Sequence, residues 1–236
     1  MFFYDSPFKL ELIGRILEKD GTPLPYSTRE VSKLSEVLMD PKKAVPNGIA
    51  YYMFRGVYAH DPLVYDITVI PSRMFGEEYV KTYGHHHTEA KEGLTYPEVY
   101  QILHGEAVFV MQTSNRDGSM NCILTKCKTG DIVFIPPNYG HVMINPGSST
   151  LVSANIVSTS FVSDYSEYKE NHGAAYYYTT DGFVQNLNCI VRKTQHLSPK
   201  ELLEASHLSI GDLLKEITQN PEKLGFLEDP TLLKSD

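Results

Sequence analysis

The sequence predicts an all-β fold, a barrel or sandwich of short strands with helical segments at both ends of the chain. Between residues 49 and 191, short apolar runs recur at close spacing and are separated by turn signals such as Asp117-Gly118 and Thr129-Gly130. No long amphipathic helix interrupts this region, which disfavours a doubly wound α/β fold. A length of 236 residues, 42% of them apolar, suits one domain with extensions.

We expect an N-terminal extension, residues 1–48, that packs on the barrel. Apolar side chains at three- and four-residue spacing predict a helix in it, starting at Ser27 or Thr28 and ending near Asp40, because Pro41 follows. Little strand character is evident before this helix. The extension is therefore expected to be helical.

The central region, residues 49–191, is the predicted barrel domain. Its apolar runs predict ten strands, which are Ile49–Phe54, Val64–Ile70, Glu78–Thr82, Glu98–Leu103, Ala107–Gln112, Cys122–Lys126, Asp131–Ile135, Val142–Asn145, Leu151–Val157 and Phe183–Val191. The remaining residues, 192–236, form a predicted helical tail. There Ser198 and Pro199 give a helix-start signal, and a second helix is expected over about 210–218.

Composition narrows the functional classes. The net charge is −8 and no lysine- or arginine-rich run is present, so nucleic acid is not an expected partner. The three cysteines are an odd number without a C-x-x-C pair, which fits buried free thiols in a reducing compartment. The N-terminal residues do not read as a signal peptide, and no apolar stretch reaches the length of a membrane span. We therefore expect a cytoplasmic protein.

Three consecutive histidines, residues 85–87, require a chemical explanation. On a strand, side chains alternate between faces, so His85 and His87 point the same way and His86 points the opposite way. Glu98 begins the next strand after a ten-residue loop, and hairpin pairing would return it to the histidines. His141 follows a later strand and can enter the same interior. Three imidazoles and one carboxylate are suitable ligands for one divalent metal ion.

The order of these residues resembles the two motifs of the cupin superfamily. H-x-H, a later Glu and a Gly, then G-x5-P-x4-H-x3-N, are matched by His85, His87, Glu98, Gly105, Gly130, Pro136, His141 and Asn145. The loop before Glu98 is longer than usual, and Asn138 stands where Gly is frequent. The resemblance implies a jelly-roll-like cupin β-barrel, here with N-terminal and C-terminal helical extensions, and leaves the reaction open.

Further stretches resemble a narrower family, the cupin-type glucose-6-phosphate isomerases first recognised in archaea. The similar stretches are residues 65–71, 81–87, 98–100, 134–141 and 163–165, and Val31–Asp40 resembles that family's N-terminal segment. The resemblance implies interconversion of glucose 6-phosphate and fructose 6-phosphate in glycolysis and gluconeogenesis by a homodimer. The expected cofactor is Fe2+, with Mn2+, Ni2+, Co2+ or Zn2+ as alternatives.

The resemblance also implies roles for individual residues. Glu98 is the candidate base as well as a metal ligand, and Tyr100 lies two residues further on, on the same strand face. The implied sugar-phosphate site is lined by Tyr51, Thr68, Thr82, Gly84, Tyr100 and Tyr165. Two family positions differ, since a histidine aligns with Ser163 and a tyrosine with Val157. For the phosphate, Lys81 and Arg55 are available cations.

Two other functions use the same motif. An iron-dependent cupin dioxygenase could have the same three histidines and one glutamate, and a non-catalytic cupin could bind a sugar without turnover. The stretches outside the metal motif favour the isomerase. Sequence leaves open whether hydrogen moves through an enediol, with Glu98 as base, or as a hydride between C1 and C2.

Overall fold

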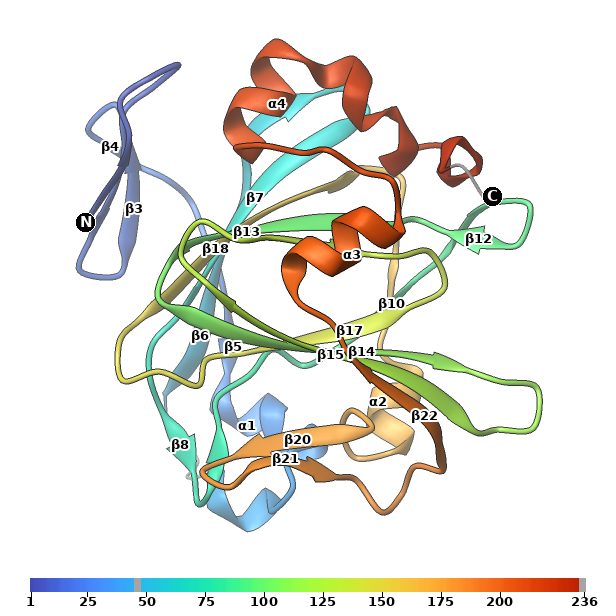
Figure 1. Ribbon diagram of the computed structural model, residues 1–236. Coiled ribbons are helices and arrows are strands. Elements are labelled where there is room, and N and C mark those ends of the chain that lie inside the picture. The colour runs from blue at the N-terminus through green and yellow to red at the C-terminus, as the bar shows by residue number, and fades with distance from the viewer. Residues whose placement is uncertain (45–47, 234–236) are drawn as a thin grey trace.

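The computed structural model describes residues 1–44 and 48–233, and it confirms the predicted all-β fold class (Figure 1). Two sheets form its centre. The larger has the strand order β16-β13-β18-β7-β6-β5. Its strands are β5 (Ser27–Glu30), β6 (Ile49–His60), β7 (Leu63–Ile70), β13 (Glu98–His104), β16 (Ile132–Ile135) and β18 (Leu151–Ser158).

The smaller central sheet has the order β17-β14-β15-β22 and faces the larger one. Its strands are β14 (Glu106–Ser114), β15 (Met120–Lys128), β17 (Gly140–Ile144) and β22 (Val191–His196). Strand β22 pairs with β15 in parallel, whereas the other pairs are antiparallel. The expected strand over Phe183–Val191 is wrong, because β21 ends at Gln185 and the chain turns before β22 begins.

Several short strands complete the molecule. A third sheet at one end contains β8 (Met74–Phe75), β9 (Glu78–Tyr79), β20 (Tyr176–Thr179) and β21 (Gly182–Gln185). The expected strand Glu78–Thr82 is therefore shorter, with Lys81 in an isolated bridge to Ile144. Two small pairs join β10 (His86–His87) to β19 (Ser163–Asp164) and β11 (Glu89–Lys91) to β12 (Leu94–Thr95).

The central strands of the larger sheet, β7, β13 and β18, are buried on both faces. On β13, Tyr100 and Ile102 belong to the core shared with the smaller sheet, whereas Val99 belongs to a second core on the outer face. The C-terminal helix α4 (Leu213–Gln219) covers that outer face and contributes Leu213. Figure 1 shows α4 over the end of β7. Alternate residues of β13 therefore enter different cores.

The C-terminal helices have a structural role that the sequence left open. Helix α3 (Pro199–Ala205) begins with the predicted capping signal, since Ser198 and Glu201 form a capping box. At the start of α4, the backbone N–H of Leu213 donates to Oε1 of the buried Gln101, at 2.9 Å. Gln101 in turn donates to Asp212 at 3.1 Å. Two 3-10 helices, Pro221–Leu227 and Pro230–Leu232, follow.

The N-terminal prediction was wrong in its secondary structure. Residues 27–30 form the edge strand β5, so the helix expected from Ser27 to Asp40 is reduced to α1 (Val31–Leu34) and a 3-10 turn, Ser35–Val37, with a second 3-10 turn at Pro41–Lys43. The apolar residues that suggested a helix are nevertheless buried. Pairing of β5 with β6 replaces the helical hydrogen bonds of residues 27–30, and local periodicity does not reveal such long-range pairing.

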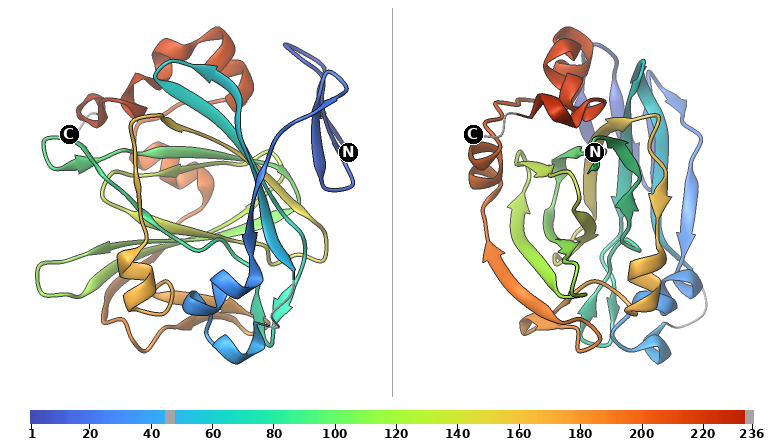
Figure 2. Two further views of the ribbon diagram at one scale, coloured as in Figure 1. Left: turned by 180° about the vertical axis from the view of Figure 1, so that it is seen from behind. Right: turned by 90° about the vertical axis from the view of Figure 1, so that its right-hand side faces the viewer.

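A small sheet precedes β5 and was not expected. It contains β1 (Phe2–Tyr4), β2 (Leu10–Ile13), β3 (Ile16–Lys19) and β4 (Thr22–Pro23). Figures 1 and 2 show it as a separate sheet beside the larger one. Its residues Leu10, Leu12 and Leu17 belong to the core on the outer face of the larger sheet. Asp20-Gly21, both at positive φ, forms its last turn and was an available hairpin signal.

The division at residues 48 and 191 into extension, barrel and tail remains a prediction. Three cysteines are buried and free, as expected. Among residues 1–44 and 48–233, no helix is long and apolar enough to cross a membrane.

Candidate metal centre and substrate pocket

The structure brings His85, His87, Glu98 and His141 together between the two central sheets. One ligand atom from each lies within 4.8 Å of all the others. Glu98 is the first residue of β13 in the larger sheet, whereas His141 belongs to β17 in the smaller one. His85 forms a β-bridge with His141, which ties the histidine segment to β17. The four side chains therefore meet where the two sheets approach each other.

His86 points away from this group, as strand alternation predicts. Its Nε2 lies 3.0 Å from Oε1 of Glu167. Gln112 and Ser114 also donate to this carboxylate. Because Glu167 belongs to helix α2 (Ser166–Glu170), the contact ties α2 to the back of the histidine segment.

The donor atoms of the group are arranged as metal ligands. Nδ1 of His87 lies 2.8 Å from the carbonyl oxygen of Tyr96, so the neutral ring carries its proton there and Nε2 presents a lone pair. This Nε2 lies 3.1 Å from Nε2 of His85 and 3.4 Å from Oε2 of Glu98. Unprotonated nitrogens and a carboxylate this close repel one another unless a cation or proton lies between them.

The electrostatics also suit a bound cation. Burial lowers the pKa of His87 to about 4 and holds the pKa of His85 well below its ordinary value, so both rings are neutral near pH 7. Burial alone would raise the pKa of Glu98, but His141, His87 and Arg55 lower it below its ordinary value. Oε2 of Glu98 is buried without a hydrogen-bond partner. Three imidazoles, of which those of His85 and His87 are neutral, and one carboxylate therefore fit a divalent metal ion.

A pocket adjoins this group, and His85, Glu98 and His141 line it. The structure brings all six residues implied for the substrate to its wall, namely Tyr51, Thr68, Thr82, Gly84, Tyr100 and Tyr165. Other residues that line it were not expected, namely Arg29, Met53, Tyr83, Met143, Asn155 and Phe161. Arg29 was missed because its segment suggested a helix. Asn155 is buried with an unpartnered Nδ2, a feature that sequence does not reveal.

Gly84 is required by its surroundings. Its φ is +87°, and a Cβ atom at this position would lie 2.4 Å from the ring of Tyr168. A larger residue would therefore strain the backbone and displace this buried tyrosine. Because His85 follows directly, Gly84 helps to fix the start of the metal group.

The residues expected to recognise phosphate are not equivalent. Lys81 is buried and paired with Glu78 at 2.5 Å, and it does not line the pocket. Arg55 does line the pocket, with its guanidinium 2.6 Å from Asp66. Lys81 is therefore unavailable to a ligand in this pocket.

The two positions at which this chain differs from the family do not line the pocket. Ser163 belongs to β19 and pairs with His87, and Val157 is buried elsewhere.

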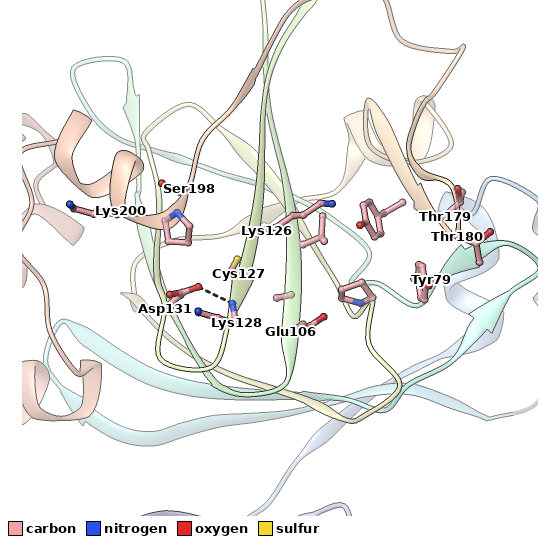
Figure 3. A pocket seen from close by; sticks show the side chains of 15 residues that line it. Tyr79, Glu106, Lys126, Cys127, Lys128, Asp131, Thr179, Thr180, Ser198 and Lys200 are labelled. Carbon is pink, nitrogen blue, oxygen red and sulfur yellow. Dashed lines mark hydrogen bonds between the residues drawn. The ribbon is translucent and has the colours of Figure 1, made fainter.

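A larger hollow, about 650 Å3, lies elsewhere (Figure 3). Lys126 and Lys128 line it and pair with Val108 and Glu106 across β14. Side chains alternate along β14, so Glu106 and Val108 lie on one face of the smaller sheet and Phe109 lies on the other. The ring of Phe109 packs on Tyr100 inside the barrel. In the part of the chain that the structure describes, the only group of three or more metal-binding side chains is the one between the sheets. The larger hollow therefore lies outside the metal centre.

This chain resembles known proteins over more than half of its length. A model of the family described as "Glucose-6-phosphate isomerase (GPI)" matches residues 50–194. The glucose-6-phosphate isomerase of Thermococcus gammatolerans is 27% identical over 187 residues, which cover 71% of this chain and 86% of that protein. The one from Thermococcus litoralis is 28% identical over 158 residues, covering 63% and 77%.

Solved structures are matched only at lower similarity. A cupin 2 conserved barrel domain protein from Rhodopseudomonas palustris has a TM-score of 0.33 and 15% identity, covering 47% of this chain and 61% of that one. Oxalate decarboxylase from Bacillus subtilis has a TM-score of 0.34 and 18% identity, over 48% of this chain and only 27% of the decarboxylase chain. Because the family model spans more than half of the sequence and includes all four residues of the candidate metal centre, the chain belongs to the cupin-type glucose-6-phosphate isomerase family.

Proposed function

We propose that this protein is a metal-dependent isomerase that interconverts glucose 6-phosphate and fructose 6-phosphate. One observation carries the proposal. Within the family match, a group of three histidines and one glutamate, all but His85 fully buried, adjoins a pocket lined by every residue that the family resemblance implied for the substrate. The names of the Thermococcus relatives support the same reaction.

Residues that line the pocket carry the groups that this reaction needs. A hydrogen must move between C1 and C2, and a proton between their oxygens. When bound, a divalent ion supplies Lewis-acid polarisation of the carbonyl group. Burial raises the pKa of Tyr100 well above its ordinary value, so its hydroxyl stays protonated and can donate to a substrate oxygen. Glu98 is the candidate base.

Glu98 has two proposed roles that compete. As a metal ligand its carboxylate is less basic, and its pKa is already below the ordinary value. An enediol route requires Glu98 to accept the carbon-bound proton, whereas a hydride shift between C1 and C2 does not. Glucose 6-phosphate deuterated at C2 distinguishes them. Loss of deuterium to water supports the enediol route, and complete transfer to C1 without loss supports the hydride shift.

The proposed reaction is tested by metal stripping and reloading. The stripped protein should be inactive, and loading with Fe2+, Mn2+, Ni2+, Co2+ or Zn2+ should restore conversion of glucose 6-phosphate. Mannose 6-phosphate is assayed in parallel as a second substrate. His87→Asn should remain inactive after loading, whereas His60→Asn, at an exposed position, should behave as the native protein. Oxygen uptake without isomerisation would identify a dioxygenase, and sugar binding without turnover would identify a non-catalytic cupin.

Further properties implied by the family complete the proposal. We place the activity in glycolysis and gluconeogenesis, in the cytoplasm, with Fe2+ as the preferred ion. We also propose a homodimer. Analytical ultracentrifugation should give twice the chain mass of 26.6 kDa, and a monomeric mass would refute the dimer.

A further inference from the structure

Arg29 is a cation in the substrate pocket that lies outside the family match. It belongs to the edge strand β5, where it pairs with Tyr51 of β6. The match begins at residue 50, so the family model says nothing of this side chain. The side chain is half-buried and lines the same pocket as Glu98 and His85.

The contacts of Arg29 are with aromatic side chains. Its Nε donates to the hydroxyl of Tyr51 at 3.2 Å. Its guanidinium carbon lies 5.6 Å from the ring centre of Tyr83 and 5.7 Å from that of Tyr165. These contacts hold the planar group in place while leaving its other N–H donors without a charged partner.

No carboxylate among the described residues lies within ion-pair distance of Arg29. This distinguishes it from Arg55, which contacts Asp66, and from Lys81, which contacts Glu78. Arg29 therefore brings a positive charge to the pocket wall that no described carboxylate neutralises. A half-buried arginine arranged in this way is suited to an anionic ligand, because a guanidinium can donate two parallel hydrogen bonds to one phosphate.

Tyr51 adds a second donor at the same place. Its hydroxyl oxygen accepts from Arg29 and lies 3.4 Å from the backbone nitrogen of Tyr83. The hydroxyl proton therefore remains available to a ligand oxygen. Tyr165 connects this end of the pocket to the metal centre, since its ring centre lies 5.7 Å from that of His85. A ligand in the pocket can thus meet both Arg29 and the candidate metal ligands.

We propose that Arg29, together with the hydroxyl of Tyr51, binds the phosphate of the substrate and makes the enzyme selective for phosphorylated over free sugars. The proposal rests on the proposed isomerase function, which places the reacting carbons of the sugar at the metal centre. Arg29 is then a specificity-determining residue that contacts the phosphate, at the end of the sugar opposite the reacting carbons.

Binding of a sugar alcohol phosphate tests this assignment without turnover. Sorbitol 6-phosphate has no carbonyl group and cannot be isomerised, and sorbitol is its counterpart without phosphate. Calorimetric titration of both into Mn2+-loaded protein should show that Arg29→Met weakens binding of sorbitol 6-phosphate by about 10- to 100-fold. Arg29→Lys should recover part of the loss, because it restores the charge without the planar fork.

Arg15→Met is a matched control. Arg15 also donates to a tyrosine hydroxyl, that of Tyr52 at 3.3 Å, but it does not line the pocket. This variant should bind sorbitol 6-phosphate as the native protein does. Circular dichroism and thermal unfolding of the Arg29 variants show whether they remain folded. For turnover, Arg29→Met should raise KM for glucose 6-phosphate more than it lowers kcat.

The outcomes separate this inference from the isomerase function. Unchanged binding of sorbitol 6-phosphate by folded Arg29→Met, or no binding by the native protein, overturns the role of Arg29. An equal loss for sorbitol and sorbitol 6-phosphate also overturns it. Phosphate-dependent binding that requires Arg29, in a protein without isomerase activity, would support the phosphate site and refute the proposed reaction.

Discussion

The hydroxyl of Tyr100 lies 3.0 Å from Nε2 of His141, and the same nitrogen lies 3.3 Å from Oε2 of Glu98. One imidazole nitrogen therefore faces both the candidate base and the candidate proton donor. When this nitrogen serves as a metal ligand, the tyrosine hydroxyl needs a new partner. A substrate oxygen at the metal centre is the partner that the proposed reaction provides.

Tyr100→Phe tests this relationship. The variant should retain the metal, because Tyr100 is not one of the four grouped ligands. Its kcat should fall by about 10²-fold, since one donor to a developing oxyanion is lost. Metal content by mass spectrometry and steady-state kinetics check both statements. Tyr26→Phe, at an exposed position outside the pocket, should leave kcat unchanged. Native kcat in Tyr100→Phe would exclude a catalytic role for this hydroxyl.

Glu98→Gln separates the two roles of this carboxylate. Loss of the base should lower kcat by about 10²- to 10⁴-fold, even when the metal is present in saturating amount. Loss of a charged ligand should also raise the metal concentration needed for half-maximal loading. Glu170→Gln, which removes an exposed carboxylate from α2, is the control. A Glu98→Gln protein that isomerises glucose 6-phosphate at the native rate would refute the proposed mechanism.

The shared direction of His85 and His87 could be predicted from sequence because its signal is local. His85 and His87 are two residues apart, so strand alternation alone places them on one face. The larger fold was also predictable, since short apolar runs with intervening turns identify the barrel strands. Arg29 could not be found in this way. Its place depends on pairing between β5 and β6, and the nearby Val31, Leu34 and Val37 fit both a helix and the observed turns.

Gly84→Ala should destabilise the fold more than a comparable change at an open glycine. The added Cβ atom would lie 2.4 Å from the ring of Tyr168, and the backbone φ of +87° is unfavourable for alanine. We expect a loss of ~2–4 kcal/mol in unfolding free energy, combining backbone strain with overpacking. Urea unfolding provides the measurement.

Gly93→Ala is the matched control for the backbone term. Gly93 has a similar φ of +78°, but nothing lies within 4 Å of its Cβ position. This variant should lose only ~1–2 kcal/mol, which is the cost of the left-handed conformation. Equal losses for the two variants would show that the contact with Tyr168 contributes nothing. Gly84→Ala should also impair metal loading, because His85 follows it directly.

The carboxylate of Glu167 should make stability depend on pH in acid. Burial raises its pKa, but hydrogen bonds from His86, Ser114 and Gln112 outweigh burial and lower the pKa to about 2, from an ordinary value of 4.5. A carboxyl group whose pKa is lower in the folded state stabilises the protein above its unfolded pKa. This contribution is therefore complete above about pH 4.5 and is lost as the pH falls toward 2.

Glu167→Gln isolates this contribution from those of other carboxylates. Urea unfolding of the native protein and the variant at pH 5, 4, 3 and 2 should give a difference in free energy that shrinks steadily across this range. The difference should be largest at pH 5, because the folded native protein then holds the ionised carboxylate among three donors. Glu170→Gln, on the exposed face of the same helix, should differ from the native protein by a small and nearly constant amount. A constant difference for Glu167→Gln from pH 5 to 2 would mean that His86, Ser114 and Gln112 do not hold this carboxylate in its charged form.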